Sequence, residues 1–278
     1  MTTRQKALVV EGGAMRGIFA AGVLDQFIES AFYDFHFCVG VSAGSTNLIG
    51  YLSGSYSRSK RIILNYATSA EFFSFKRYLK GGHLCDVSWL WHASFDAEPL
   101  SQALRCPLWV VTTSVETGQP HYFCMDKAGF NHEAIVASCS IPLAYRDYPN
   151  VDGISMTDGG IADSIPVKFA YQQGARDITV ILSRPLGYRK KNTRSIRLLK
   201  PVIRHAPALF EAMNHRHRRY NDALDFIHHP PADCTIKVIA PNETFRVGRF
   251  TMNKAYLEAG YDLGRELGKK HINEETCS

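Results

Sequence analysis

The chain of 278 residues is long enough for one large α/β domain, or for one domain with a helical extension. Hydrophobic residues make up 45% of it and charged residues 21%, which excludes a disordered chain. The net charge of +6 is uneven, because residues 184–219 hold eleven Lys and Arg against one acid.

The first part of the chain has the order of elements of a parallel α/β sheet. The apolar run 7–10 predicts a buried strand that ends at a glycine turn, and the pattern from Ile18 to Ile28 predicts a helix. Residues 35–41 predict a second strand, followed by a sharp turn and a helix over 46–52.

Further along, three apolar runs predict strands, and three stretches predict helices, the second of them basic. The strands are 108–115, 178–183 and 235–240, and the helices are 167–175, 193–229 and 254–270. Two aromatic-rich stretches, 72–79 and 87–95, form either plain core or the wall of an acyl groove. The basic segment 184–219 is either a solvated helix face or a surface for anionic lipid headgroups.

A pentapeptide of the G-x-S-x-G type lies between the second strand and its helix. It runs Gly40-Val41-Ser42-Ala43-Gly44. A serine on such a turn has strained backbone angles that expose its hydroxyl, and the glycines avoid collisions with the neighbouring strand and helix. The N–H of Ala43 then points to where an oxyanion would form. Ser42 is therefore the candidate nucleophile, against the alternative of an ordinary tight turn.

The glycine loop 11–17 (EGGAMRG) follows the first strand, and two interpretations remain open. As a dinucleotide fingerprint it would need a glycine where Ala14 stands, and Arg16 is unusual there. As an oxyanion hole it offers free N–H groups at the start of a helix. The second interpretation also explains why a G-x-S-x-G motif follows on the next strand.

The serine needs a base. No late histidine stands at the end of a predicted strand, where a Ser-His-Asp triad would place it. Asp158, in a glycine-lined turn, is the stronger candidate, with Asp152 and Asp163 as neighbours that compete for the role. A carboxylate can act as a base if burial raises its pKa and it contacts the serine directly.

Taken together, three segments resemble the patatin-like phospholipase family: EGGAMRG (11–17), GVSAGS (40–45) and DGGIADSIPV (158–167). The resemblance implies a three-layer α/β/α fold with a mostly parallel sheet, and a Ser-Asp dyad that needs no metal or cofactor. It implies Ser42 as nucleophile and selects Asp158 over Asp152 as base. It also implies an oxyanion loop at Gly12, Gly13 and Ala14, supported by Arg16. Ala14 departs from the family's usual third glycine, and its methyl group disfavours a positive φ.

The site predicted in full has catalytic, oxyanion-hole and supporting residues. Ser42 and Asp158 are catalytic; Gly12, Gly13, Ala14 and Ala43 form the oxyanion hole; Arg16, Gly17, Gly40, Gly44, Gly159 and Gly160 support them. We expect a catalytic domain over 7–185, and a basic helical region over 186–278 that completes or extends it.

The expected activity is hydrolysis of lipid acyl esters by a phospholipase, lysophospholipase or carboxylesterase. The alternatives are acyl transfer by the same dyad, or nucleotide binding by the loop 12–17. The expected partners are an acyl-ester substrate and, peripherally, an anionic membrane surface, without nucleic acid. Seven cysteines without a CxxC pair, no apolar span and no secretory signal predict a cytoplasmic protein.

Overall fold

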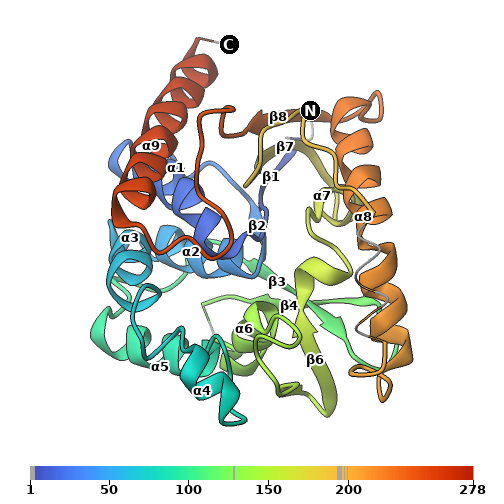
Figure 1. Cartoon of the computed structure of the whole chain (residues 1–278). Coiled ribbons are helices and arrows are strands. Elements are labelled where there is room, and N and C mark those ends of the chain that lie inside the picture. The colour runs from blue at the N-terminus through green and yellow to red at the C-terminus, as the bar shows by residue number, and fades with distance from the viewer. Residues whose placement is uncertain (1–3, 128, 193–195, 197, 199, 278) are drawn as a thin grey trace.

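A mostly parallel sheet lies between two layers of helices, which gives the chain the predicted three-layer α/β/α fold (Figure 1). The structure is a computed structural model that describes residues 4–127, 129–192, 196, 198 and 200–277. The strands are β1 (Gln5–Val10), β2 (Phe37–Val41), β3 (Leu108–Ser114), β4 (Pro120–Met125), β5 (Asn150–Val151), β6 (Ile154–Asp158), β7 (Ala175–Ile181) and β8 (Thr235–Ile239). The α-helices are α1 (Gly17–Glu29), α2 (Ala43–Leu52), α3 (Arg58–Arg61), α4 (Phe75–Leu79), α5 (Val87–Ala97), α6 (His132–Cys139), α7 (Val167–Gln172), α8 (Pro207–His228) and α9 (Lys254–Thr276).

The sheet has the order β5-β6-β3-β2-β1-β7-β8, and β4 also pairs with β3. The core pairs β3–β2, β2–β1, β1–β7 and β7–β8 are parallel, whereas β4 and β6 run antiparallel to β3. All five strands expected from the sequence are therefore present. The hairpin strand β4 was not expected, because its half-exposed side chains give no continuous apolar run.

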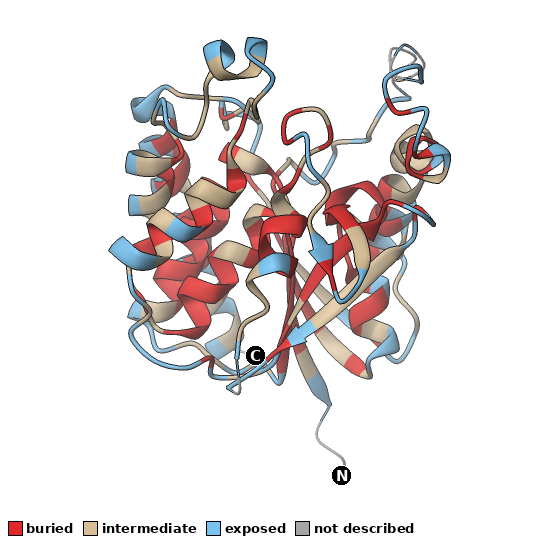
Figure 2. Ribbon diagram, turned by 90° about the horizontal axis from the view of Figure 1, so that it is seen from below, coloured by how far each residue is buried: buried red, intermediate tan, exposed pale blue. Residues whose placement is uncertain are grey.

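Alternate residues of the central strands face opposite helix layers. In β1, Leu8 and Val10 pack into the core beneath α1 and α2, whereas Ala7 and Val9 pack into the core beneath α7 and α8. All four side chains are fully buried. Figure 2 shows the same distribution, with buried residues along the strands and on the helix faces turned toward them. A sheet covered on both faces explains the continuous apolar runs in the sequence.

Strand β3 brings two separate strands end to end along one edge. Its residues Leu108–Val111 pair with β2, and Thr112–Ser114 pair with β6. Since β4 runs along the other edge of β3, β2 and β6 occupy the same edge and point toward each other. The residue after β2 is Ser42 and the last residue of β6 is Asp158, so this pairing sets the two side by side.

The basic stretch after β7 is less helical than the sequence predicts. A helix was expected over 193–229, but α8 begins at Pro207, and residues 200–205 form turns. Residues 193–195, 197 and 199 lie outside the described part of the chain. The physical reason is proline, which lacks an N–H and clashes inside a helix but fits its first turn, where Pro207 stands.

The last part of the chain joins the same core. Strand β8 extends the sheet beside β7, and α9 lies along α1 (Figure 1). The two helices approach so closely that a Cβ on Gly264 would lie 2.1 Å from the carbonyl oxygen of Phe19. No helix in the described ranges is long and apolar enough to cross a membrane.

We expect Gly264→Ala to lower the free energy of unfolding by about 1–3 kcal/mol. Alanine favours a helix over glycine by about 1 kcal/mol, but a backbone collision at 2.1 Å outweighs this gain. Denaturant unfolding measures the effect. Gly129→Ala is the matched control, because no heavy atom lies within 4 Å of its added Cβ. An unchanged midpoint in Gly264→Ala would contradict the close packing of α1 and α9.

Candidate active site

Ser42 occupies a strained turn between β2 and α2. Its φ of 53° and ψ of −126° lie in a region that non-glycine residues rarely adopt. The flanking glycines allow this turn, because a Cβ on Gly40 would lie 2.6 Å from the Cα of Ser45, and one on Gly44 would lie 2.4 Å from the carbonyl oxygen of Val10. The structure thus places these glycines where the sequence motif requires them.

The strained turn is fastened by Ser138 on α6. The N–H of Ser42 donates to Ser138 Oγ at 2.8 Å, and that hydroxyl donates to the carbonyl oxygen of Val111 at 2.6 Å. Ser138 is fully buried. It therefore ties the turn to β3, and the N–H of Ser42 is occupied by this bond. The sequence did not single out Ser138, because nothing local relates it to a turn 96 residues earlier.

The side chains of Ser42 and Asp158 line the same cavity, and an interaction with the Ser42 side chain lowers the pKa of Asp158. They are each 6% exposed. Asp158 Oδ1 also accepts the N–H of Gly160 at 2.7 Å. Burial raises the pKa of Asp158, while the positive charge of Arg216 and the Gly160 N–H oppose the rise. The arrangement offers a carboxylate of increased basicity beside a serine hydroxyl.

The other groups that could act as a base for Ser42 are less suited than Asp158. Asp152 is exposed in the turn between β5 and β6, away from the buried serine. Asp163 accepts the hydroxyl of Tyr122 at 2.9 Å, and burial raises its pKa to about 6. Cys139 lines the same cavity as Ser42, but burial raises the pKa of its thiol to about 12, so it stays protonated.

The glycine loop lies directly against the serine. A Cβ on Gly12 would lie 3.1 Å from Ser42 Cβ, which leaves space for hydrogen alone. Ala14 adopts φ 50°, the conformation that its methyl group disfavours. In the described part of the chain, the N–H groups of Gly13, Ala14 and Ala43 find no backbone or side-chain acceptor. These three donors stand at two helix starts beside Ser42.

Arg16 braces this loop against the end of β7. Its Nε donates to the carbonyl oxygen of Ser183 at 3.1 Å, and its Nη2 donates to Ser183 Oγ at 3.1 Å. The N–H of Ser183 in turn donates to the Glu11 carboxylate at 2.6 Å. A Cβ on Gly13 would lie 2.9 Å from Ser183 Cβ, so the loop and β7 are in contact. Ser183 and Glu11 are supports that the sequence did not identify.

The remaining predicted residues lie at contacts between elements. A Cβ on Gly17 would lie 2.9 Å from Ala43 Cβ, where α1 begins beside α2, and one on Gly159 would lie 2.1 Å from the carbonyl oxygen of Val111. A Cβ on Gly160 would lie 2.9 Å from Asp158 Oδ1. These glycines therefore let the segments that hold Ser42 and Asp158 approach closely. Among the described residues, no group of three or more His, Cys, Asp and Glu is placed to hold a metal ion.

An apolar cavity opens on one side of Ser42. Its walls include side chains from both aromatic-rich stretches, among them Phe72, Phe73, Leu90 and Trp91. Aromatic stretches that could equally have been plain core thus line a cavity beside the serine. Such a cavity can hold an acyl chain through hydrophobic contact.

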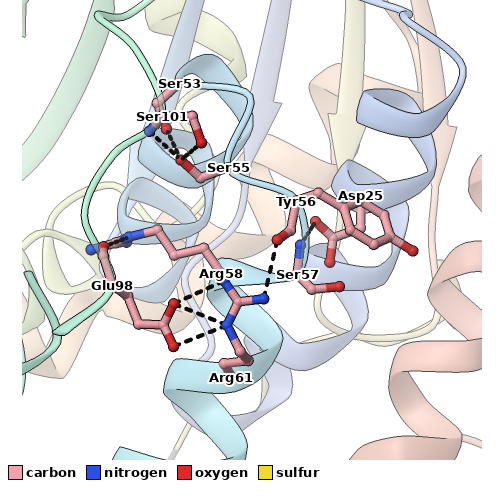
Figure 3. A network of polar contacts seen from close by, with 9 residues as sticks. All are labelled: Asp25, Ser53, Ser55, Tyr56, Ser57, Arg58, Arg61, Glu98 and Ser101. Atoms are coloured by element: carbon pink, nitrogen blue, oxygen red, sulfur yellow. Dashed lines mark hydrogen bonds and ion pairs between the residues drawn. The ribbon is translucent and has the colours of Figure 1, made fainter.

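Part of the cavity wall is fixed by the polar network of Figure 3. Arg58, which lines the cavity and is 1% exposed, donates from Nε to the carbonyl oxygen of Glu98 at 2.6 Å. The Glu98 carboxylate accepts two hydrogen bonds from Arg61, each of 2.9 Å. On the other side of this segment, the N–H of Ser57 donates to Asp25 at 3.0 Å (Figure 3). The network ties the wall to α1 and α5.

Comparison with known proteins shows the family and the fold of the chain. A family model described as patatin-like phospholipase matches residues 8–171, and a model of a domain of unknown function (DUF6363) matches residues 206–275. The uncharacterized protein YjjU of Escherichia coli K12 is 32% identical over 278 residues, with 95% of this chain and 76% of YjjU covered. The crystal structure of VipD from Legionella pneumophila is similar in fold, with a TM-score of 0.50 at 12% identity over 98% of this chain and 67% of VipD. The chain therefore belongs to the patatin-like phospholipase family, a family of lipid acyl hydrolases.

Proposed function

We propose that the protein is a serine hydrolase of lipid acyl esters that acts through Ser42, Asp158 and a covalent acyl-enzyme. The observation that carries the proposal is that the ends of β2 and β6 meet, so that Ser42, which lines an apolar cavity, lies beside the buried carboxyl group of Asp158. A raised pKa of Asp158 supports its role as base. The family of the chain supports the same class of reaction.

The proposed reaction has two halves. Asp158 accepts the proton of Ser42 while Ser42 Oγ attacks the ester carbonyl carbon, and the N–H groups of Gly13, Ala14 and Ala43 hold the oxyanion. Collapse of this intermediate breaks the ester bond, and Asp158 gives its proton to the leaving alcohol. Asp158 then takes a proton from a water molecule as that water attacks the carbonyl carbon of the acyl-enzyme. When the bond between Ser42 Oγ and the acyl group breaks, Asp158 returns this proton to Ser42 Oγ, and the acid is released.

Two other functions use parts of the same site. Acyl transfer would follow if an alcohol other than water attacked the acyl-enzyme. Nucleotide binding by residues 12–17 is the weaker candidate, because the close approach of Gly12 to Ser42 leaves the loop facing the serine. Product analysis with and without an added alcohol separates hydrolysis from transfer, and calorimetry with a nucleotide tests the remaining function.

We also propose that residues 7–185 form the catalytic domain and that residues 186–278 complete the same domain. The position of β8 in the sheet and the close packing of α9 on α1 support this division. Arg249, from the second part, lines the cavity beside Ser42 and supports it further.

The dyad is tested by three variants. We expect Ser42→Ala to lose labelling by a fluorophosphonate probe, and Asp158→Asn to lower kcat by about 10²- to 10⁴-fold. Asp158→Asn should keep or raise the unfolding temperature, because a neutral amide avoids the burial of an ionised carboxylate. Asp152→Asn is the matched control and should retain full activity. Labelling of folded Ser42→Ala, or full turnover by Asp158→Asn, would reject the dyad.

The rate should fall on the acid side of neutrality as Asp158 becomes protonated and can no longer act as a base. Because burial raises the pKa of Asp158, this loss should occur above the pH of about 4 at which a free aspartate titrates. The charges of Arg216 and Arg249 oppose the rise, so Arg249→Gln should move the acid limb to higher pH. A pH profile of kcat with a short soluble ester measures the position of the acid limb and its shift in Arg249→Gln. If the midpoint of the acid limb lay at or below the pH at which a free aspartate titrates, Asp158 would not be the base.

Contact with an anionic membrane is proposed for the rim of the apolar cavity. Phe250 lines this cavity and is 51% exposed, and on α4 Phe75 and Leu79 are 62% and 74% exposed beside two exposed lysines, Lys76 and Lys80. Exposed apolar side chains next to lysines suit an anionic lipid interface.

We expect the double variant Phe75→Ser, Leu79→Ser to float less with anionic vesicles, while its hydrolysis of a short soluble ester stays unchanged. Tyr256→Ser removes another exposed apolar side chain, on α9 and outside both α4 and the basic segment, and serves as the control. Flotation with phosphatidylcholine vesicles, with and without an anionic phospholipid, measures the effect. Equally negligible binding to both vesicles would reject membrane contact.

A further inference from the structure

Two cysteine thiols lie in contact between β2 and the segment that leads into β3. The sulfur atoms of Cys38 and Cys106 are 3.9 Å apart, although the two residues are 68 positions apart in the chain. All the cysteines are free thiols. Within the described ranges, this is the one pair of cysteine thiols joined by a hydrogen bond. The proposed reaction at Ser42 uses neither of them.

Backbone hydrogen bonds hold the chain on both sides of this contact. The N–H of Cys38 donates to the carbonyl oxygen of Pro107 at 2.9 Å, and Cys38 pairs with Leu108 in the parallel ladder of β2 and β3. The N–H of Arg105 donates to the carbonyl oxygen of Leu52, the last residue of α2, at 3.1 Å. The two sulfur atoms therefore meet because the sheet and α2 place them together.

The two thiols differ in their access to solvent. Cys38 is fully buried in the core, whereas Cys106 is partly exposed. Cys106 also stands between two exposed residues, Arg105 and Pro107. A small dissolved reagent can therefore reach the sulfur of Cys106 but not that of Cys38.

The contact between the thiols also makes Cys106 the more reactive of the two. With Cys38 as the donor, the hydrogen bond stabilises the Cys106 thiolate and lowers the pKa of Cys106. Burial raises the pKa of Cys38 well above that of a free thiol. Since the thiolate is the form that reacts with oxidants, Cys106 is placed to react first, with Cys38 beside it.

A disulfide between these residues requires a small movement. Two bonded sulfur atoms lie about 2 Å apart, so the 3.9 Å contact has to shorten by roughly half. Cys106 belongs to the irregular segment 98–107 between α5 and β3. It can move toward Cys38 while the hydrogen-bonded ladder of β3, which begins at Leu108, stays intact.

We propose that Cys106 and Cys38 form a reversible redox site, in which a hydroperoxide oxidises Cys106 and Cys38 then closes a disulfide. The site is independent of the proposed hydrolase function, because neither cysteine lines the cavities beside Ser42. Cys38 stands four residues before Ser42 on the chain. The disulfide therefore links the strand that leads to the proposed nucleophile to the entry of β3.

The reaction balances in two steps. The Cys106 thiolate attacks one oxygen of the hydroperoxide, the O–O bond breaks, and the leaving oxygen takes up the proton that Cys106 gave up, which leaves Cys106 as a sulfenic acid. The Cys38 sulfur then attacks the Cys106 sulfur, the S–S bond forms and the S–O bond breaks, and the departing hydroxide takes the proton of Cys38 to become water. Two thiols are oxidised to one disulfide while the hydroperoxide is reduced to an alcohol and water.

The first experiment maps the cross-link in the folded protein after treatment with hydrogen peroxide. Trypsin leaves Cys38 in the peptide 17–58 and Cys106 in the peptide 106–127, which also holds Cys124. The parent protein is therefore Cys124→Ser, so that the second peptide has one thiol. We expect a linked pair of these peptides with a mass lower than their sum by two hydrogen atoms, and its loss when dithiothreitol is added.

The second experiment assigns the order of the two steps in the same parent protein. Cys38→Ala should abolish the cross-link and let the sulfenic acid of Cys106 accumulate, which a dimedone probe traps. Cys106→Ser should leave Cys38 unmodified, because Cys38 is fully buried. Cys277 is exposed at the end of α9, so its oxidation in every sample shows that the peroxide was active.

Three results would overturn the inference. The first is oxidation of Cys277 without any linkage of Cys106 to Cys38. The second is dimedone labelling of Cys106 that is as strong in the parent protein as in Cys38→Ala, because Cys38 would then not react with the sulfenic acid. The third is an equal yield of the same cross-link in protein unfolded by urea, because the folded contact would then not direct the reaction.

Discussion

The pairing of strand β3 with two strands on one edge determines the rest of the site. β2 runs parallel to β3 and β6 runs antiparallel to it, and their ends meet between Val111 and Thr112. This meeting places Ser42 next to Asp158 although the two are far apart in sequence. No flexible loop has to bring the two groups together, because backbone hydrogen bonds of a buried sheet fix both strands.

Strained backbone and a buried carboxyl group occur together where the ends of β2 and β6 meet. Ser42 and Ala14 both have positive φ, and Asp158 is a carboxyl group at 6% exposure. Each feature costs free energy, on the order of 1–3 kcal/mol for a strained residue. The surrounding structure offsets the cost with specific contacts, such as Ser138 on the Ser42 N–H and Ser183 on Arg16. Strain and burial that cost free energy, held by specific contacts, are typical of a preorganised active site.

Two cavities lie on different sides of the proposed dyad. On one side, aromatic and aliphatic side chains line the apolar cavity, and on the other side charged side chains of both signs line a second cavity. Arg249 lines both cavities, and Arg216 reaches the second from α8. The C-terminal part of the chain, which the second family model matches, thereby contributes side chains near Ser42 and Asp158, which lie in the part that the first model matches.

Local patterns in the sequence determined the parallel α/β fold, the turn at Ser42 and the glycine loop. These features depend on neighbours within a few residues: apolar runs make buried strands, and glycines permit tight turns. The helix α8 is shorter than the predicted 193–229, because Pro207 fits the first turn of a helix and not its interior. The glycine-lined turn made Asp158 the stronger candidate base, and the family resemblance also selected it over Asp152, which stands in a similar Asp-Gly turn. Tertiary structure alone decided that Ser138 fastens Ser42, that Ser183 holds Arg16, and that Arg216 and Arg249 converge beside Asp158. Those contacts join segments distant in the chain, and a linear pattern carries no information about which distant side chains the packing of the sheet will bring together.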